Sequence, residues 1–168
     1  MTNPYDQNEE VSKVLVKVVQ EVSEVSNVSD ELRLPSIGEN LYDLHVRLLA
    51  VRARQQRASE LVGTLIRIQA NVRKLVLDRK SELDAAEAKA VIPSKQAFVE
   101  DFSSAQERNA RLRSKTLNER VSLTAAEKLQ VDVDAALAYA QQVYRQLGNQ
   151  SYDVNTRIKV LGMEGTLD

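Results

Sequence analysis

A run of about fifty residues, from Leu41 to Ala90, carries the apolar repeat that most constrains how this chain can fold. Steps of alternately three and four residues along the run meet fifteen positions, and twelve of them are apolar. Residues at this spacing share one face of a helix, so the run predicts one long amphipathic helix with a coiled-coil seam. The positions are Leu41, Leu44, Leu48, Val51, Gln55, Ala58, Val62, Leu65, Gln69, Val72, Val76, Arg79, Leu83, Ala86 and Ala90.

The polar side of the same predicted helix is almost entirely basic. Between His45 and Lys80, nine Lys and Arg residues stand against two acidic ones, a net charge of +7 in a chain whose net charge is −1. A helix with one buried face and one cationic face suits a polyanion or an acidic protein. The cations predicted to contact a nucleic acid are Arg47, Arg54, Arg57, Arg67, Arg73, Lys74, Arg79 and Lys80.

The segment before the long helix is acidic and is predicted to be its partner. Up to Asp43, nine acidic residues stand against three basic ones, a net charge of −6. Its apolar seam consists of Val11, Leu15, Val18, Val22, Val25 and Leu32, with Ser29 as a gap. Opposite charges favour folding this helix back onto the basic one. The basic face would then be neutralised partly or wholly within the protein, and this alternative stays open beside a nucleic-acid partner.

Short breaks divide the rest of the chain into helices. Pro35 and Gly38 interrupt the helical pattern, and Pro93 ends the long helix with Ser94 as the next cap. Thr124 and Glu127 form a capping-box pattern that opens a further helix. The predicted organisation is a flexible lead over 1–10, a single elongated domain over 11–161 with helices at about 11–34, 39–90, 95–120, 125–147 and 152–161, and a flexible tail over 162–168.

Composition favours elongated helices over a large globular core. The chain has two Phe, five Tyr and no Trp in 168 residues, and only five Gly and three Pro. We therefore expect an all-α fold of elongated helical hairpins that forms a homo-oligomer, because thin apolar stripes bury little within one copy. The expected oligomerisation seam consists of Leu48, Val51, Val62, Leu65, Val72, Val76, Leu129, Val133, Val143 and Leu147.

The sequence gives little support for an enzymatic function. Glu21 and Glu24, followed by Glu39 and Asp43, resemble the paired carboxylates of all-helical nucleotide pyrophosphohydrolases, but the second pair is four residues apart rather than three. The one histidine, His45, has no nearby nucleophile, and the absence of cysteine removes thiolate metal sites. We expect no enzymatic activity, no cofactor and no metal.

The sequence shows no targeting or membrane segment. Its first ten residues are polar and acidic rather than basic and then apolar, as in a signal peptide. No apolar run approaches the roughly 20 residues of a membrane span. We expect a soluble protein without a membrane partner, located in the cytoplasm, which would be the bacterial host cytoplasm for a phage-encoded chain.

Two stretches resemble the UvsY family of phage recombination mediators, over roughly residues 45–161. They are Leu65-Ile66-Arg67-Ile68-Gln69-Ala70 and the run from Val121 to Asp132 that leads into Ala136-Leu137-Ala138-Tyr139. The chain departs from the family after Arg79, where it reads Lys80-Ser81-Glu82-Leu83 instead of a basic, aromatic and glycine-containing stretch. The resemblance implies a ring-like oligomer that binds single-stranded DNA and helps load a RecA-type recombinase in place of single-strand-binding protein. It implies DNA contacts at Arg67, Arg73, Lys74, Arg79 and Lys80.

The sequence therefore leaves two alternative functions open, and they belong to different functional classes. The first is sequence-independent binding of single-stranded DNA by a recombination mediator, driven by phosphate contacts and weakened by salt. The second is a structural role, as a virion head-to-tail or scaffold component that acts through helical protein contacts.

Overall fold

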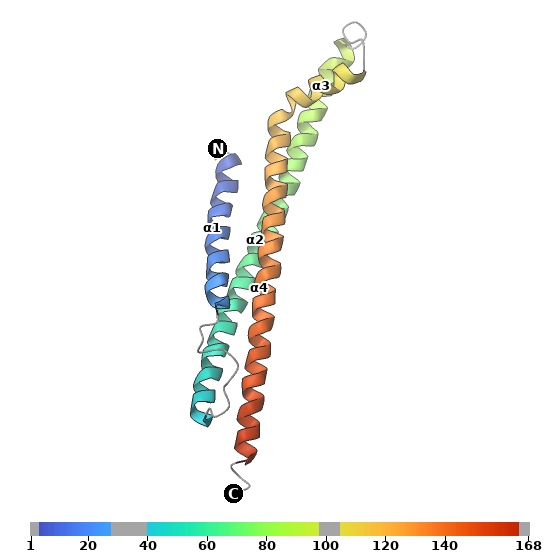
Figure 1. Cartoon of the computed structure of the whole chain (residues 1–168). Coiled ribbons are helices and arrows are strands. Elements are labelled where there is room, and N and C mark those ends of the chain that lie inside the picture. Colours follow the sequence, from blue (N-terminus) through green and yellow to red (C-terminus); the bar gives the residue numbers. More distant parts are fainter. Residues whose placement is uncertain (1–3, 28–39, 98–104, 165–168) are drawn as a thin grey trace. The chain divides into compact units, whose positions relative to one another are not determined.

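The chain is all-α in a computed structural model, which describes residues 4–27, 40–97 and 105–164 (Figure 1). The described residues form four helices, α1 (Pro4–Ser26), α2 (Leu41–Ala97), α3 (Ala105–Lys115) and α4 (Leu117–Glu164). The two long helices, α2 and α4, pack against each other as a hairpin. The predicted fold class is thus confirmed for its helices and for the hairpin.

The start of α2 is fixed by a side-chain cap. The backbone N–H of Asp43 donates to Oδ1 of Asn40 at 2.9 Å, which satisfies one of the amides left free at the end of a helix. Asp43 also places a negative charge in the first turn, where the helix dipole favours it. The helix then continues for 57 residues, and its middle contains strong helix formers and one glycine, Gly63.

Contacts divide the molecule into two compact units. The first unit comprises residues 1–13 and 68–134, and the second comprises residues 14–67 and 135–168. In the first unit, Nε2 of Gln69 on α2 donates to Oδ1 of Asp134 on α4 at 2.6 Å. In the same unit, Arg120 on α4 forms an ion pair with Glu87 on α2. Each unit therefore contains its own segment of the α2–α4 packing.

The second unit also contains most of α1. Its apolar cluster joins Leu44 and Leu48 of α2 to Val154 of α4, with Ile158 and Leu161 packed against it. The end of α1 is held by a hydrogen bond of 3.0 Å between the hydroxyl groups of Ser26 and Tyr139. The predicted packing of the acidic N-terminal helix onto the basic one is found here, since α1 also contacts α2 through side chains described below.

The predicted seam is the core of a single chain. Eight of its ten residues are buried, and Val62 and Val76 are half-buried. Leu65 and Val133 are fully buried, with 0% of their surface exposed. The structure therefore places these residues inside the hairpin of one copy, and their role between copies stays a prediction.

A buried threonine, Thr116, marks the junction between α3 and α4. Its hydroxyl donates to the carbonyl of Leu112 at 2.9 Å and accepts from Nε of Arg120 at 3.1 Å. A threonine that bonds back to the carbonyl four residues earlier bends a helix. Backbone bonds run through the junction nonetheless, because Thr116 N donates to Leu112 O and Arg120 N donates to Thr116 O.

The N-terminal helix begins earlier and ends sooner than predicted. The proposed lead over 1–10 is helical from Pro4, a residue that suits the first helical position because its missing N–H would have no partner there. An ion pair of 2.7 Å between Glu9 and Lys13 supports the first turns, and its hydrogen bond lowers the pKa of the Glu9 carboxyl. The helix ends at Ser26, and the predicted seam positions Ser29 and Leu32 lie outside the described residues.

The predicted breaks around the C-terminal helices are wrong. The prediction of separate helices over 95–120, 125–147 and 152–161 fails, because α4 is one helix of 48 residues and α3 is a short helix before it. Thr124 lies inside α4 and caps nothing. Gly148 also lies inside it, since the buried spacing continues from Leu147 to Val154 and this burial outweighs the roughly 1 kcal/mol helix penalty of glycine.

The break at Pro93 is wrong as well. The helix α2 continues past this proline to Ala97. A proline inside a helix loses one backbone hydrogen bond and crowds the carbonyl four residues earlier, and a helix can absorb both through a local kink.

No helix in the described part of the chain is long and apolar enough to cross a membrane.

Shortening a buried side chain of the seam should destabilise the hairpin. We expect Leu65→Ala to lower the free energy of unfolding by about 2 to 5 kcal/mol, because it removes a fully buried side chain and leaves a cavity. Urea unfolding followed by circular dichroism would measure the change. Leu49→Ala is the matched control, since Leu49 is 67% exposed on the same helix and should cost less than about 0.5 kcal/mol. Equal effects of the two variants would contradict this core assignment.

Candidate nucleic-acid interface

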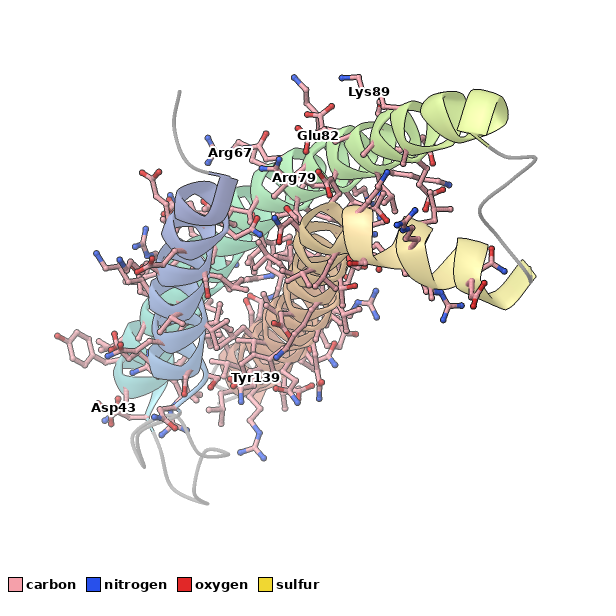
Figure 2. All side chains as sticks on the ribbon, turned by 90° about the horizontal axis from the view of Figure 1, so that it is seen from above. Asp43, Arg67, Arg79, Glu82, Lys89 and Tyr139 are labelled. Atoms are coloured by element: carbon pink, nitrogen blue, oxygen red, sulfur yellow. The ribbon has the colours of Figure 1, made fainter. Side chains whose placement is uncertain are left out.

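The structure separates the eight predicted DNA-binding cations into three groups. All lie on α2, but they differ in burial and in their partners. Figure 2 labels two of them, Arg67 and Arg79. Four make contacts within the chain, one is buried in the seam, and three are exposed without a hydrogen bond or ion pair to a described residue. Only the last group is free to bind a polyanion without first losing a contact.

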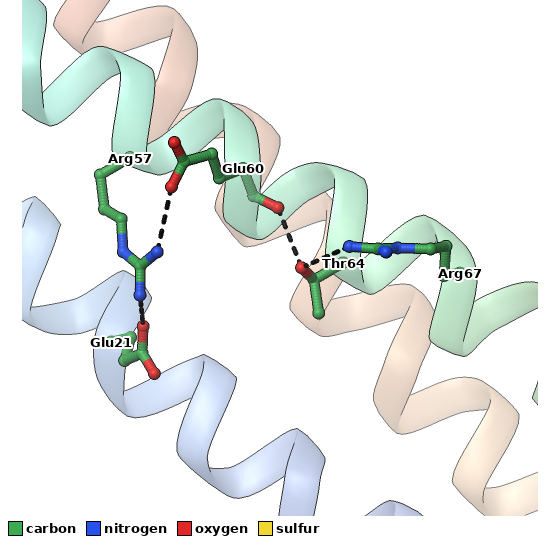
Figure 3. A network of polar contacts seen from close by, with 5 residues as sticks. All are labelled: Glu21, Arg57, Glu60, Thr64 and Arg67. Atoms are coloured by element: carbon green, nitrogen blue, oxygen red, sulfur yellow. Dashed lines mark hydrogen bonds and ion pairs between the residues drawn. The ribbon is translucent and has the colours of Figure 1, made fainter.

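Arg57 is held by two carboxylates in the second unit. One terminal nitrogen donates to Glu60 on the same helix at 3.0 Å, and the other pairs with Glu21 on α1 (Figure 3). The hydrogen bonds from Arg57 to Glu60 and Glu21 raise the pKa of the guanidinium above its ordinary value. The prediction that the acidic N-terminal helix neutralises part of the basic face is confirmed at this ion pair.

Two neighbouring arginines are also engaged. Arg54 is half-buried and donates from one terminal nitrogen to the carbonyl of Asn27 at 3.0 Å, beside the end of α1. Arg47 is half-buried. A nucleic acid that bound here would compete with contacts already made, so these arginines are weak candidates.

Arg67 is exposed but forms one hydrogen bond to a residue of its own helix. One terminal nitrogen donates to the hydroxyl of Thr64 at 3.3 Å, and that hydroxyl donates to the carbonyl of Glu60 at 3.0 Å (Figure 3). The contact is weak because it involves a neutral acceptor at long distance, and the residue as a whole is exposed.

Arg79 was predicted to contact DNA, but the structure buries its side chain. Its side chain is only 8% exposed and its terminal nitrogen pairs with Glu82 at 2.7 Å (Figure 2). The Nε atom is buried without a hydrogen-bond partner among the described residues. Arg79 occupies a seam position of the apolar repeat, so packing against the rest of the first unit takes its side chain out of solvent.

The remaining three cations, Arg73, Lys74 and Lys80, form a surface that we call the outer basic patch. All three are exposed and lie in the first unit. None of them forms an ion pair with the side chains that the structure describes. Arg73 and Lys80 are seven residues apart, which corresponds to two helical turns, or about 10 Å in total along the helix axis. Asp78 lies within the same stretch and offsets part of the charge.

Sequence reasoning missed one residue of this surface. Leu77 is 66% exposed and stands between the three cations of the outer basic patch. It falls outside the three-and-four steps of the seam, so its exposure could have been inferred from the repeat itself.

The acidic residues form no metal site in the described part of the chain. Groups of three or more potential metal ligands are absent there, and Glu21 is occupied by Arg57. Glu39, the third acid of the pyrophosphohydrolase comparison, lies outside the described residues. His45 bonds the carbonyl of Leu41 through Nδ1 at 2.7 Å, one turn earlier on the same helix.

No protein-family model, curated protein or solved structure matches this chain.

Arg79 should behave as a residue of the core. We expect Arg79→Met to raise the free energy of unfolding by about 1 kcal/mol, because a well-packed apolar side chain replaces a buried guanidinium with an unpaired N–H. Its partner Glu82 is 55% exposed and can be solvated after the change. Chemical unfolding would give the value. A clear loss of stability would show that the ion pair supports the fold.

Proposed function

We propose that this protein is a non-enzymatic, sequence-independent binder of single-stranded DNA that acts as a recombination mediator. The observation that carries the proposal is the outer basic patch, where three exposed cations on one helix have no ionic partner among the described residues. Lys and Arg that neutralise phosphates release counterions, and this release drives binding without regard to sequence.

The size of the patch implies that several copies act together. Three phosphate contacts give weak binding at physiological salt, and Asp78 reduces the local charge further. Copies of the patch held in one homo-oligomer would bind the same strand with a high effective concentration. The proposal therefore includes a homo-oligomer, and the sequence resemblance supports a ring.

The remaining parts of the proposal rest on that resemblance. They are assistance in loading a RecA-type recombinase, exchange with single-strand-binding protein, and action in the cytoplasm, which is that of the bacterial host if the chain is phage-encoded.

Salt dependence and charge reversal test the binding surface. We expect the affinity for a labelled single strand, measured by fluorescence anisotropy, to fall with a log–log salt slope of about −2 per patch, because each phosphate contact on a single strand contributes about −0.7. Arg73→Glu combined with Lys74→Glu should abolish binding and leave the oligomeric state unchanged.

A matched control separates the patch from net charge. Arg52 is an exposed arginine of α2 outside the patch, so Arg52→Glu changes the net charge by the same amount as Arg73→Glu. We expect Arg73→Glu to weaken binding far more than Arg52→Glu. Equal losses would mean that overall charge, and not the outer basic patch, determines the affinity.

The second candidate function, a virion head-to-tail or scaffold component, is favoured by a separate observation. Tyr42, Val46 and Leu49 follow one another at spacings of four and three on α2, and all three are exposed. Exposed apolar side chains at coiled-coil spacing suit a protein contact. In addition, Arg57 already demonstrates that the cations of α2 pair with carboxylates.

Assembly without nucleic acid distinguishes the two candidates. For the structural component, we expect nuclease-treated protein to form its full assembly in light scattering, with no change when single-stranded DNA is added and no salt-sensitive DNA binding. For the mediator, DNA binding that weakens with salt is required whatever the oligomeric state. Absence of DNA binding at low salt would leave only the structural function.

A further inference from the structure

Leu77 is an apolar side chain surrounded by cations on the outward face of α2. It is 66% exposed, and Arg73, Lys74 and Lys80 stand four before, three before and three after it. On a helix these spacings make direct surface neighbours, with Cβ atoms about 5 to 6 Å apart. A phosphate backbone held by the three cations would therefore pass beside Leu77.

We propose that Leu77 contacts unpaired bases and makes the outer basic patch prefer single-stranded over double-stranded DNA. The inference rests on the proposed function, because it concerns the same surface. It adds a specificity-determining residue that the charges alone do not supply, since phosphates are present on both kinds of DNA.

The physical basis lies in where each kind of DNA keeps its bases. A single strand can turn its bases away from its backbone, and their apolar faces can then cover the exposed side chain of Leu77. A duplex keeps its bases stacked inside and presents phosphates and sugars. Binding of a duplex would therefore bring Leu77 next to a charged backbone, where it gains no apolar contact.

Stacking of aromatic side chains on bases contributes strongly to single-strand binding and sets an upper limit for an aliphatic contact. Removing an aromatic stacking residue weakens binding by roughly fivefold to a hundredfold or more per base. A leucine has less surface and no ring, so we expect a smaller contribution, about threefold to fivefold per site. The apolar contact is tolerant of sequence, as the proposed function requires.

A leucine-to-lysine change separates this role from charge. Leu77→Lys places a fourth cation in the centre of the patch, so a surface that senses charge alone would bind both kinds of DNA more tightly. If Leu77 contacts bases, duplex affinity should rise while single-strand affinity stays level or falls, and the ratio of the two should drop by about fivefold. Leu77→Ala should weaken single-strand binding by about threefold and leave duplex binding unchanged.

Val131 provides the matched control. It is 66% exposed on α4 and lies outside the patch, so Val131→Lys adds the same charge to an equally exposed apolar position. We expect Val131→Lys to leave the ratio of single-strand to duplex affinity unchanged. Thermal unfolding would verify that all three variants are folded, which their exposure favours.

The possible outcomes separate the inference from the function it rests on. If the unmodified protein binds no DNA at low salt, the proposed function and the inference both fail. If it binds but Leu77→Lys strengthens single-strand and duplex binding equally, the function stands and the role of Leu77 is overturned. A change of oligomeric state in DNA-free Leu77→Ala, measured by sedimentation, would also overturn it, because Leu77 would then contact another copy.

Discussion

The burial of one apolar seam between α2 and α4 determines the rest of this structure. Both helices place apolar side chains at alternating steps of three and four, and fully buried Leu65 and Val133 show how completely the two sets exclude water. This packing supplies the stability that long helices do not have in isolation. It also decides which side of α2 faces outward, so the availability of every cation on that helix follows from its position relative to the seam.

The polar members of the seam are as informative as the apolar ones. Gln69 reaches Asp134 across the hairpin, and the Nε2 atom of Gln55 lies 3.2 Å from the position that a Cβ on Gly148 would occupy. Arg79 is buried with one N–H unpaired, which costs free energy. Polar groups in a coiled-coil seam fix register at some cost in stability, and the bond from Gln69 to Asp134 suits this role.

The sequence predicted the all-α class and the buried positions of the seam, because both depend on local spacing. It misplaced the ends of the helices, since Gly148 and Thr124 are common signals of a boundary that tertiary packing overrode. The site was harder to predict for a different reason. Charge counting predicted that the N-terminal helix neutralises part of the basic face, but it could not identify the pair formed by Arg57 and Glu21, which are distant in the sequence. Arg79 stood both in the predicted seam and among the predicted DNA contacts, and only the packing decided between them.

The register of the helix pair within each unit also limits how its length can change. Gln69 contacts Asp134 in the first unit, and Gln55 lies beside Gly148 in the second unit. Each of these contacts fixes which faces of α2 and α4 meet within its unit. A single inserted or deleted residue would rotate everything beyond it by about 100° and expose the seam. Insertions and deletions in this protein's relatives should therefore occur in steps of seven residues, matched in α2 and α4.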